Sequence, residues 1–309
     1  MLKKTTNRLS ELDALRGIAA LSFVFFHYFY HYHFTYNSGP EISIAKYGHY
    51  GVQLFFFISG FVIYLSVNAA DSTSSFLKSR FIRLYPTYWV ALLISFAVVT
   101  TFGLEGREVT PNTALINLTM FGGYFGTKYV DGVYWTLSIE LAFYLIIALA
   151  FTFRCLRYSD SIITLLTLFY IFLNKSIHYE FLPFERVWLF SYSPYFVIGI
   201  FFYKQKYQRD LNLGSYASIF LTIALLIYQG SAEDIVALIL LIAIFYAALF
   251  TSFTKSILRH FVFFGKISYA LYLAHQNLGF VIIQHSKDLK LSYRLYFIFN
   301  NCLEPDKIY

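Results

Sequence analysis

Long apolar segments alternate with short polar connections along almost the whole chain. Several of these segments approach the roughly 20 apolar residues that a membrane-spanning helix needs. From length and hydropathy we place membrane helices at residues 12–33, 49–67, 84–103, 133–153, 160–174, 187–203, 213–229, 234–252 and 261–284. A tenth apolar segment, 291–299, is too short to span a bilayer. The pattern predicts an all-α fold, a polytopic transmembrane bundle of about nine to ten helices that forms one domain over residues 1–309.

The connections between these helices alternate in charge. Every second connection, beginning with the N-terminal one, is rich in basic residues: Lys3, Lys4 and Arg8; Lys78, Arg80 and Arg83; Arg154 and Arg157; Lys204, Lys206 and Arg209; Lys255, Arg259 and Lys266. Because cytoplasmic connections carry the excess of Lys and Arg, we expect a cytoplasmic N-terminus and a first helix that is a retained signal-anchor. After residue 284 the alternation fails and the hydrophobic remainder is short, so we expect the last helix to be truncated.

Composition supports a membrane protein and argues against other classes. Hydrophobic residues make up 58% of the 309 residues and charged residues 13%, against about 25% charged in ordinary soluble domains. A soluble core of this size could not hide so much apolar surface. The net charge of +7 is explained by the basic cytoplasmic connections, so nucleic acid is not an expected partner. The cysteines, Cys155 and Cys302, have the spacing of neither a disulfide framework nor a metal site.

Ionisable side chains fall inside the predicted membrane helices. Arg16 and His27 stand eleven residues apart in LDALRGIAALSFVFFH, so they share one helix face about 16 Å apart. His27, Glu140 and His275 are each predicted to lie in the outer third of the membrane. Ionisable groups are costly there and are functional by default, although a lone histidine could be satisfied by a backbone carbonyl. We therefore expect a His–Glu–His level on the outer side.

Three arginines fall below that level, at the predicted cytoplasmic rim. They are Arg16 and, three residues apart in SRFIRLYP, Arg80 and Arg83; Pro86 suits the first turn of the next membrane helix. Because the planar guanidinium forms bidentate hydrogen bonds with phosphate, the cluster suggests an anionic ligand held beneath the chemistry. Arginines at such a rim are also common as topology anchors or snorkelling side chains.

Other histidines and one glycine have simpler interpretations. We expect His31, His33 and His49 at the outer mouth, facing solvent. With no cysteine and few acids nearby, their spacing does not indicate a metal site. Gly60, in LFFFISGF, would allow the close approach of a neighbouring helix.

Five segments carry a resemblance to a known family. In chain order they are LDALRGIAALSFVFFH, GVQLFFFISGFVI, FLKSRFIRLYPTYWV, GVYWTLSIELAFYL and KISYALYLAHQNLG. Together they resemble the acyltransferase-3 family of integral membrane acyltransferases, of the O-antigen and exopolysaccharide O-acetylase type. The resemblance covers residues 9–282, whereas 285–309 depart from the closing helix usual in the family. It implies a multi-pass enzyme of the bacterial inner membrane that acylates glycans.

The resemblance also implies catalytic roles. Arg16 and His27 would be the essential pair, with His27 as the catalytic base. Glu140 matches the acidic position of the family's fourth-helix motif, and we expect its carboxylate to act beside His27. His275 would orient the acceptor, assist proton transfer or support packing.

The implied reaction is O-acyl transfer to a hydroxyl of a surface glycan or a lipid-linked saccharide. The donor, generally acetyl-CoA, would bind from the cytoplasm near Arg16, Arg80 and Arg83, and no metal is implied. The hydroxyl would attack the thioester directly, or a covalent acyl intermediate would form first. Substrate contacts would come from the fourth and fifth segments: Tyr134, Trp135, Ser268 and Tyr272.

Two other functions fit parts of the sequence. A proton-coupled transporter also uses intramembrane histidines and carboxylates, but it predicts inverted repeats with broken helices, and we find no such pattern. An inactive, truncated family member would account for the short apolar remainder after residue 284.

Overall fold

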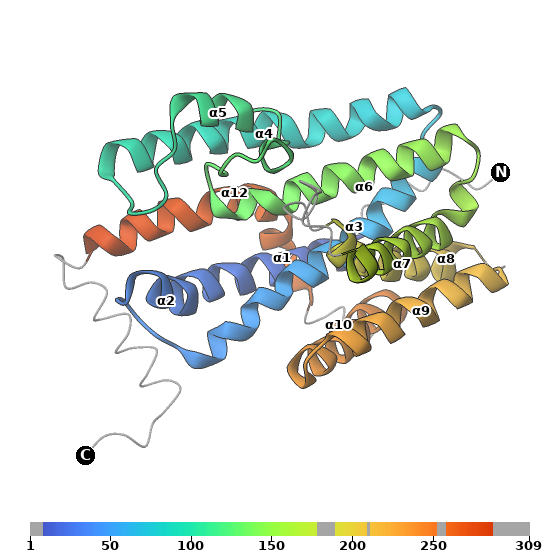
Figure 1. The fold of residues 1–309 in the computed structure, drawn as a ribbon. Coiled ribbons are helices and arrows are strands. Elements are labelled where there is room, and N and C mark those ends of the chain that lie inside the picture. Colours follow the sequence, from blue (N-terminus) through green and yellow to red (C-terminus); the bar gives the residue numbers. More distant parts are fainter. Residues whose placement is uncertain (1–8, 178–188, 209–210, 252–257, 287–309) are drawn as a thin grey trace, which may run out of the picture.

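The chain is all-helical throughout the part that the structure describes, which is residues 9–177, 189–208, 211–251 and 258–286. In this computed structural model most of the long helices run roughly side by side as a bundle (Figure 1). The predicted fold class, an all-α helix bundle, is confirmed. The short apolar segment 291–299 and the predicted truncation of the last helix lie outside the described residues.

A helix forms in every segment that the apolar pattern predicted to be helical within the described residues. The first half of the chain contains α1 (Ser10–Phe26), the π-helical turn η1 (His27–His31), α2 (Tyr32–Tyr36), η2 (Ser43–Tyr50), α3 (Gly51–Asn68), α4 (Thr73–Phe102), α5 (Pro111–Asn117), η3 (Gly122–Phe125), η4 (Gly132–Tyr134) and α6 (Trp135–Thr152). The second half contains η5 (Leu156–Tyr158), α7 (Ser159–Ile177), α8 (Leu189–Tyr207), α9 (Leu213–Gln229), α10 (Ala232–Phe250), η7 (Arg259–Phe261) and α12 (Val262–Ser286).

Six helical segments of the described chain are long and apolar enough to cross a membrane. They are Ser10–Tyr36, Ser43–Asn68, Thr73–Phe102, Gly132–Thr152, Leu156–Leu173 and Ala232–Phe250, and the apolar helix α9 is shorter. These helices indicate a multi-pass membrane protein. Six of the predicted spans are thus supported by length and composition.

The helix that carries Arg80 and Arg83 starts earlier than the apolar pattern predicted. α4 begins at Thr73, where the Ser72 hydroxyl accepts a hydrogen bond from the backbone N–H of Ser75 at 3.2 Å. The prediction that Pro86 lies in a first turn was wrong, because Pro86 lies well inside this longer helix. A hydropathy profile places the start of the helix after the charged residues. The backbone is nevertheless helical there, and the long charged side chains can extend away from the apolar surface.

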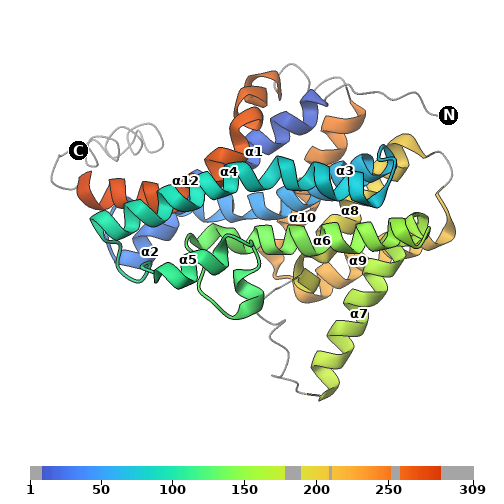
Figure 2. The same cartoon turned by 90° about the horizontal axis from the view of Figure 1, so that it is seen from above.

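The first helix lies at the centre of the bundle, where α1 packs against both α12 and α3 (Figures 1 and 2). This close approach requires glycine, because a methyl group at Gly265 of α12 would collide with the backbone of Asp13. Gly60 of α3 meets the backbone of Phe196 in α8 in the same way, which confirms its predicted role in packing. The far end of α7 diverges from the bundle (Figure 2).

Candidate active site

Two histidines from distant helices meet in the interior. His27 and His275 are both buried, and His275 Nε2 lies 3.1 Å from His27 Nδ1. His27 opens the π-helical turn η1, in which the N–H of Tyr32 bonds to the His27 carbonyl five residues earlier. Such turns occur frequently at functional sites. The structure therefore brings together two of the side chains that were predicted to lie at one depth.

The hydrogen bonds of these rings define where their protons lie. A backbone carbonyl only accepts, so His27 Nδ1, 3.0 Å from the Phe23 carbonyl, carries a hydrogen. The same holds for His275 Nδ1, 2.7 Å from the Tyr272 carbonyl. In neutral rings both Nε2 atoms are then unprotonated, and that of His275 faces the Nδ1–H of His27. His27 Nε2 has no hydrogen bond to the described residues, so it offers a lone pair at the cavity that His27 lines.

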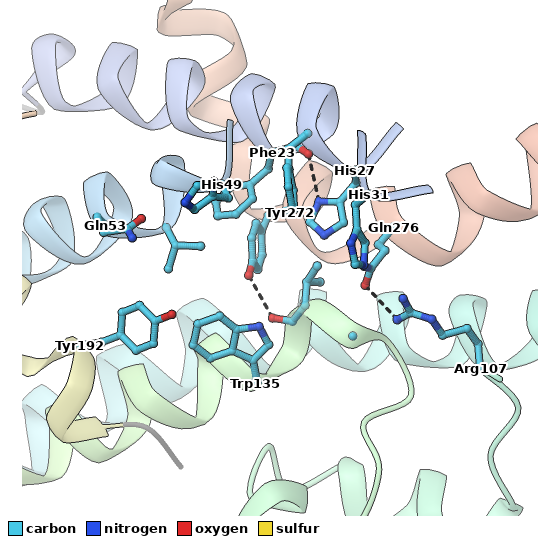
Figure 3. Close-up of a pocket in the computed structure, with 14 residues that line it drawn as sticks. Phe23, His27, His31, His49, Gln53, Arg107, Trp135, Tyr192, Tyr272 and Gln276 are labelled. Atoms are coloured by element: carbon cyan, nitrogen blue, oxygen red, sulfur yellow. Dashed lines mark hydrogen bonds between the residues drawn. The ribbon is translucent and has the colours of Figure 1, made fainter. Parts of the chain in front are cut away.

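His27 lines a cavity of about 340 Å³, here called the histidine pocket (Figure 3). Its full lining is Phe23, Phe26, His27, His31, His49, Val52, Gln53, Arg107, Gly132, Val133, Trp135, Tyr192, Tyr272 and Gln276. His31 and His49, which were expected at the outer mouth, are half-buried and both line this pocket. His33 does not line the histidine pocket, and its Nε2 lies 3.5 Å from the Glu41 carboxylate.

Sequence reasoning missed the polar wall of the histidine pocket. Arg107 donates a hydrogen bond to Oε1 of Gln276 at 3.4 Å (Figure 3), and its guanidinium lies 5.6 Å from the ring centroid of Phe280. Arg107 belongs to the connection between α4 and α5, whose charges looked balanced and ordinary. Gln276 directly follows His275 within the fifth motif segment, which is the signal that could have identified it.

A buried carboxylate connects α12 to the start of α6. Asp131 accepts hydrogen bonds from the N–H groups of Asn277, at 3.0 Å, and Val133, at 3.2 Å. The side-chain amide of Asn277 donates to Ser95 Oγ and to the carbonyl of Val130. Asp131 and Asn277 are fully buried, and burial raises the pKa of Asp131 to about 6. These bonds fix the part of α12 that faces the histidine pocket.

A second, larger cavity of about 1410 Å³ borders the histidine pocket. The charged residues on its wall are Asp13, Arg16, Asp71, Arg83, Glu140 and Lys266. A guanidinium nitrogen of Arg16 lies 3.7 Å from the Asp13 carboxylate, and Arg83 and Glu140 also act electrostatically on Arg16. Two of the three predicted arginines are thus gathered at one cavity, together with a lysine and carboxylates.

Glu140 lines the large cavity rather than the histidine pocket. Its Oε1 accepts hydrogen bonds from the hydroxyls of Tyr144, at 2.6 Å, and Ser59, at 3.2 Å. The role of Glu140 in tuning His27 stays a prediction, and the two side chains line different cavities. Equal depth along separate helices does not fix the direction in which a side chain faces. Glu140 shares its α6 face with Thr136, four residues earlier, and both line the large cavity.

Three of the predicted substrate residues line the cavities. Trp135 lines the histidine pocket, where its ring lies 5.1 Å from that of Tyr192 (Figure 3). Ser268 lines the large cavity, and Tyr272 lines both. The hydroxyl of Tyr272 donates to the Val133 carbonyl at 3.0 Å, so this ring is held in place (Figure 3).

Tyr134 and Arg80 line neither cavity. Tyr134 is buried, and its hydroxyl donates to the carbonyl of Leu273 at 3.3 Å, so it connects the start of α6 to α12. The guanidinium of Arg80 lies 6.0 Å from the ring centroid of Phe76. Arg83 and Glu140 act electrostatically on Arg80, but of the two arginines only Arg83 lines the large cavity.

One face of α1 passes from one cavity to the other. Arg16 lines the large cavity, His27 lines the histidine pocket, and Phe23 lines both. Their spacings of seven and four residues place all three on one side of the helix, in agreement with the predicted common face of Arg16 and His27. The two compartments and the helix face between them form the candidate active site.

A model of a protein family described as an acyltransferase domain matches residues 9–300 of the chain. The chain belongs to the acyltransferase-3 family. The family match contains all the motif segments that carried the resemblance and extends beyond residue 282.

The acyltransferase is also similar to several curated proteins. It is 28% identical over 155 residues to nodulation protein 10 of Rhizobium leguminosarum bv. viciae, covering 44% of this chain and 42% of that protein. It is 30% identical over 152 residues to acyltransferase MdmB of Streptomyces mycarofaciens, covering 45% and 38%. The matches therefore span less than half the length of these two relatives.

A more extended similarity is to ORF330 of Acidianus two-tailed virus, whose name proposes an acetyltransferase. The two chains are 24% identical over 295 residues, which covers 89% of this acyltransferase and 85% of the viral protein. No solved structure matches the chain.

Proposed function

We propose that this acyltransferase moves an acyl group, acetyl in the first instance, from cytoplasmic acyl-CoA to a hydroxyl of a cell-surface glycan or lipid-linked saccharide, in the bacterial inner membrane. The observation that carries the proposal is the single face of α1 that presents Arg16 to the large cavity and His27 to the histidine pocket. A cationic site for the donor and a base for the acceptor thereby lie on one continuous path.

His27 acts as the general base. Its Nδ1–H is held by the Phe23 carbonyl and faces His275, so its Nε2 lone pair accepts the proton of the acceptor hydroxyl. The hydroxyl oxygen forms a bond to the acyl carbon as the carbon–sulfur bond breaks, and the CoA sulfur leaves with the proton that His27 took up. His275 orients the base through its own bond to the Tyr272 carbonyl.

The large cavity receives the donor. Its volume of about 1410 Å³ is more than that of an ordinary small-molecule pocket, and CoA is a long ligand that carries several phosphates. Arg16, Arg83 and Lys266 supply cations for these phosphates; Asp13 forms an ion pair with Arg16, and Glu140 acts on Arg16 electrostatically. By the positive-inside rule this cavity opens toward the cytoplasm.

The histidine pocket receives the acceptor. Trp135 and Tyr192 offer aromatic rings against which the apolar face of a sugar can stack, and Arg107 and Gln276 offer hydrogen bonds to its polar groups. Aromatic surface with a few fixed polar groups suits a glycan better than it suits a small ion. This composition favours an acyltransferase over a transporter.

The decisive test is the transfer of label from radiolabelled acetyl-CoA into cell-envelope glycan. Separate membranes would carry equal amounts of the natural chain, of His27→Ala and of His33→Ala. His33→Ala is the control because His33 lies in α2, which continues α1 and η1, but lines neither cavity. We expect His27→Ala to reduce transfer by about 10²-fold or more and His33→Ala to leave it within about twofold. Equal transfer by all three chains would remove His27 from the reaction. Proton-coupled solute flux without acyl-CoA would instead favour transport.

A further inference from the structure

Three aromatic rings meet where the two cavities adjoin. The ring centroids of Phe23 and Phe55 lie 5.8 Å apart, those of Phe23 and Tyr272 lie 5.2 Å apart, and those of Phe55 and Tyr272 lie 5.6 Å apart. The rings come from α1, α3 and α12. Each touches the other two, and we call this group the aromatic constriction.

The position of these rings makes them a shared wall. Phe23 and Tyr272 line both the large cavity and the histidine pocket, as does Val52, one turn before Phe55 on α3. Aromatic rings at these separations are in van der Waals contact, so there is no open passage through their centre. A group that moves from Arg16 to His27 along α1 must displace at least one ring.

The three rings differ in how firmly they are held. The Tyr272 hydroxyl bonds to the Val133 carbonyl and to the Thr136 hydroxyl, which lies 2.8 Å away. Phe23 is buried, and its carbonyl is the one that holds His27. Phe55 is half-buried, has no polar atom that would restrain it, and lines only the large cavity. Rotation of the Phe55 ring into that cavity is therefore the least costly way to open the constriction.

We propose that the aromatic constriction selects the acyl group by size, and that Phe55 sets the limit. This inference rests on the proposed function, in which the thioester enters from the large cavity and reacts at His27. An acetyl group requires a small displacement of Phe55, whereas each further methylene must be accommodated between packed rings that cannot spread without strain. The donor site itself, around Arg16 and Arg83, has no part in this selection.

The first experiment compares acetyl-, butyryl- and octanoyl-CoA as donors to envelope glycan. For the natural chain we expect transfer to fall by about tenfold or more from acetyl to octanoyl. Phe55→Ala should reduce this ratio to below about threefold, and Phe55→Leu should give an intermediate ratio. Phe96→Ala is the matched control, because Phe96 is also half-buried but lines neither cavity. Equal use of the three donors by the natural chain would overturn the proposal, as would an unchanged ratio in Phe55→Ala.

A second experiment uses binding and labelling rather than transfer. Bromoacetyl-CoA should alkylate His27, with a new carbon–nitrogen bond formed as bromide leaves, and free CoA should compete. Phe55→Trp should reduce this labelling severalfold more than it reduces the affinity for CoA, which is measured separately because Phe55 lines the large cavity. Iodoacetamide, which can enter from the acceptor side, should label His27 equally in both chains.

The outcomes separate two kinds of failure. If CoA neither binds nor competes, the proposed donor site is wrong and the inference falls with it. If bromoacetyl-CoA labels His27 equally in the natural chain and in Phe55→Trp, the donor site stands but the constriction does not select.

Discussion

At the scale of single residues, the pairing of two histidines defines the chemistry available to the site. His275 holds no position from which it could replace His27 as the base, because its Nε2 faces the Nδ1–H of His27. In the proposed mechanism it orients the ring of His27. This assignment makes a prediction that differs from the effect of removing His27 itself.

His275→Phe keeps an aromatic ring in α12 but removes the acceptor at Nε2. We expect kcat to fall by about tenfold to a hundredfold while KM for acetyl-CoA changes by less than about twofold, because His275 does not line the large cavity that is the proposed donor site. Steady-state kinetics in membranes with matched protein amounts would measure this. A large rise in KM for acetyl-CoA with unchanged kcat would contradict the orienting role.

The sequence predicted which side chains lie together only where they belong to the same helix. Arg16 and His27 share a face because both belong to α1, and spacing alone defines a face on one helix. Glu140 was misplaced because its depth was estimated on α6 alone, whereas its direction depends on packing against other helices. Arg107, His49 and Tyr192 were missed for the same reason: each reaches the histidine pocket from a different segment.

At the scale of elements, the packing of α12 against the start of α6 depends on one buried carboxylate, that of Asp131. Asp131 has an ordinary pKa of 3.8 and a pKa of about 6 in the folded chain, since burial disfavours its charged form. Folding therefore favours the protonated form of Asp131 more than the unfolded chain does. The resulting contribution to stability is fully present below about pH 4 and is lost as pH rises through about 6, an effect of roughly 3 kcal/mol.

Asp131→Asn removes this titration and replaces one of the two acceptor oxygens with a donor. We expect the variant to be less stable overall, but with a midpoint of thermal unfolding that declines less between pH 4 and pH 7 than that of the natural chain. Unfolding in detergent across this pH range would measure the slope. Glu105→Gln is the control because Glu105 is exposed. Identical slopes for Asp131→Asn and the natural chain would argue against a buried titrating Asp131.

Helix positions followed from hydropathy better than helix ends did. The apolar centre of each described segment is helical, as expected, because a bilayer requires backbone groups to be satisfied within the segment. The start of α4 was missed by eleven residues, since Ser72 caps a polar first turn and the charged residues Lys78, Arg80 and Arg83 follow it, so hydropathy excludes this part of the helix. The π-helical turn at His27 left no signal in the apolar pattern, because it depends on the path of the backbone rather than on polarity.

At the scale of the whole molecule, the alternation of basic connections predicts the orientation in the membrane. Cys155 is a free, half-buried thiol beside Arg154 and Arg157, in a connection expected on the cytoplasmic side. In a Cys302→Ser background, a membrane-impermeant maleimide should label Cys155 in inside-out vesicles and leave it unlabelled in right-side-out vesicles.

The matched test places one cysteine on the other side. Ser43 is exposed at the first residue of the second span, directly after the connection from the first, so Ser43→Cys in a chain that lacks both natural cysteines should give the opposite pattern. Labelling of both positions from the same side would invalidate the assigned orientation. The family and the membrane class were recognisable from sequence because they depend on motifs and composition, which need no packing information.

The contact between Phe23, Phe55 and Tyr272 has a consequence for the membrane itself. An enzyme whose reaction path crosses a bilayer is at risk of becoming a leak for protons and ions. With the three rings in contact, the proposed path leaves no room between them for a continuous column of water from one cavity to the other. The same contact shields a bound thioester from hydrolysis by water that enters with the acceptor. In the proposed function, the constriction thus lets an acyl group cross while the membrane stays electrically insulated.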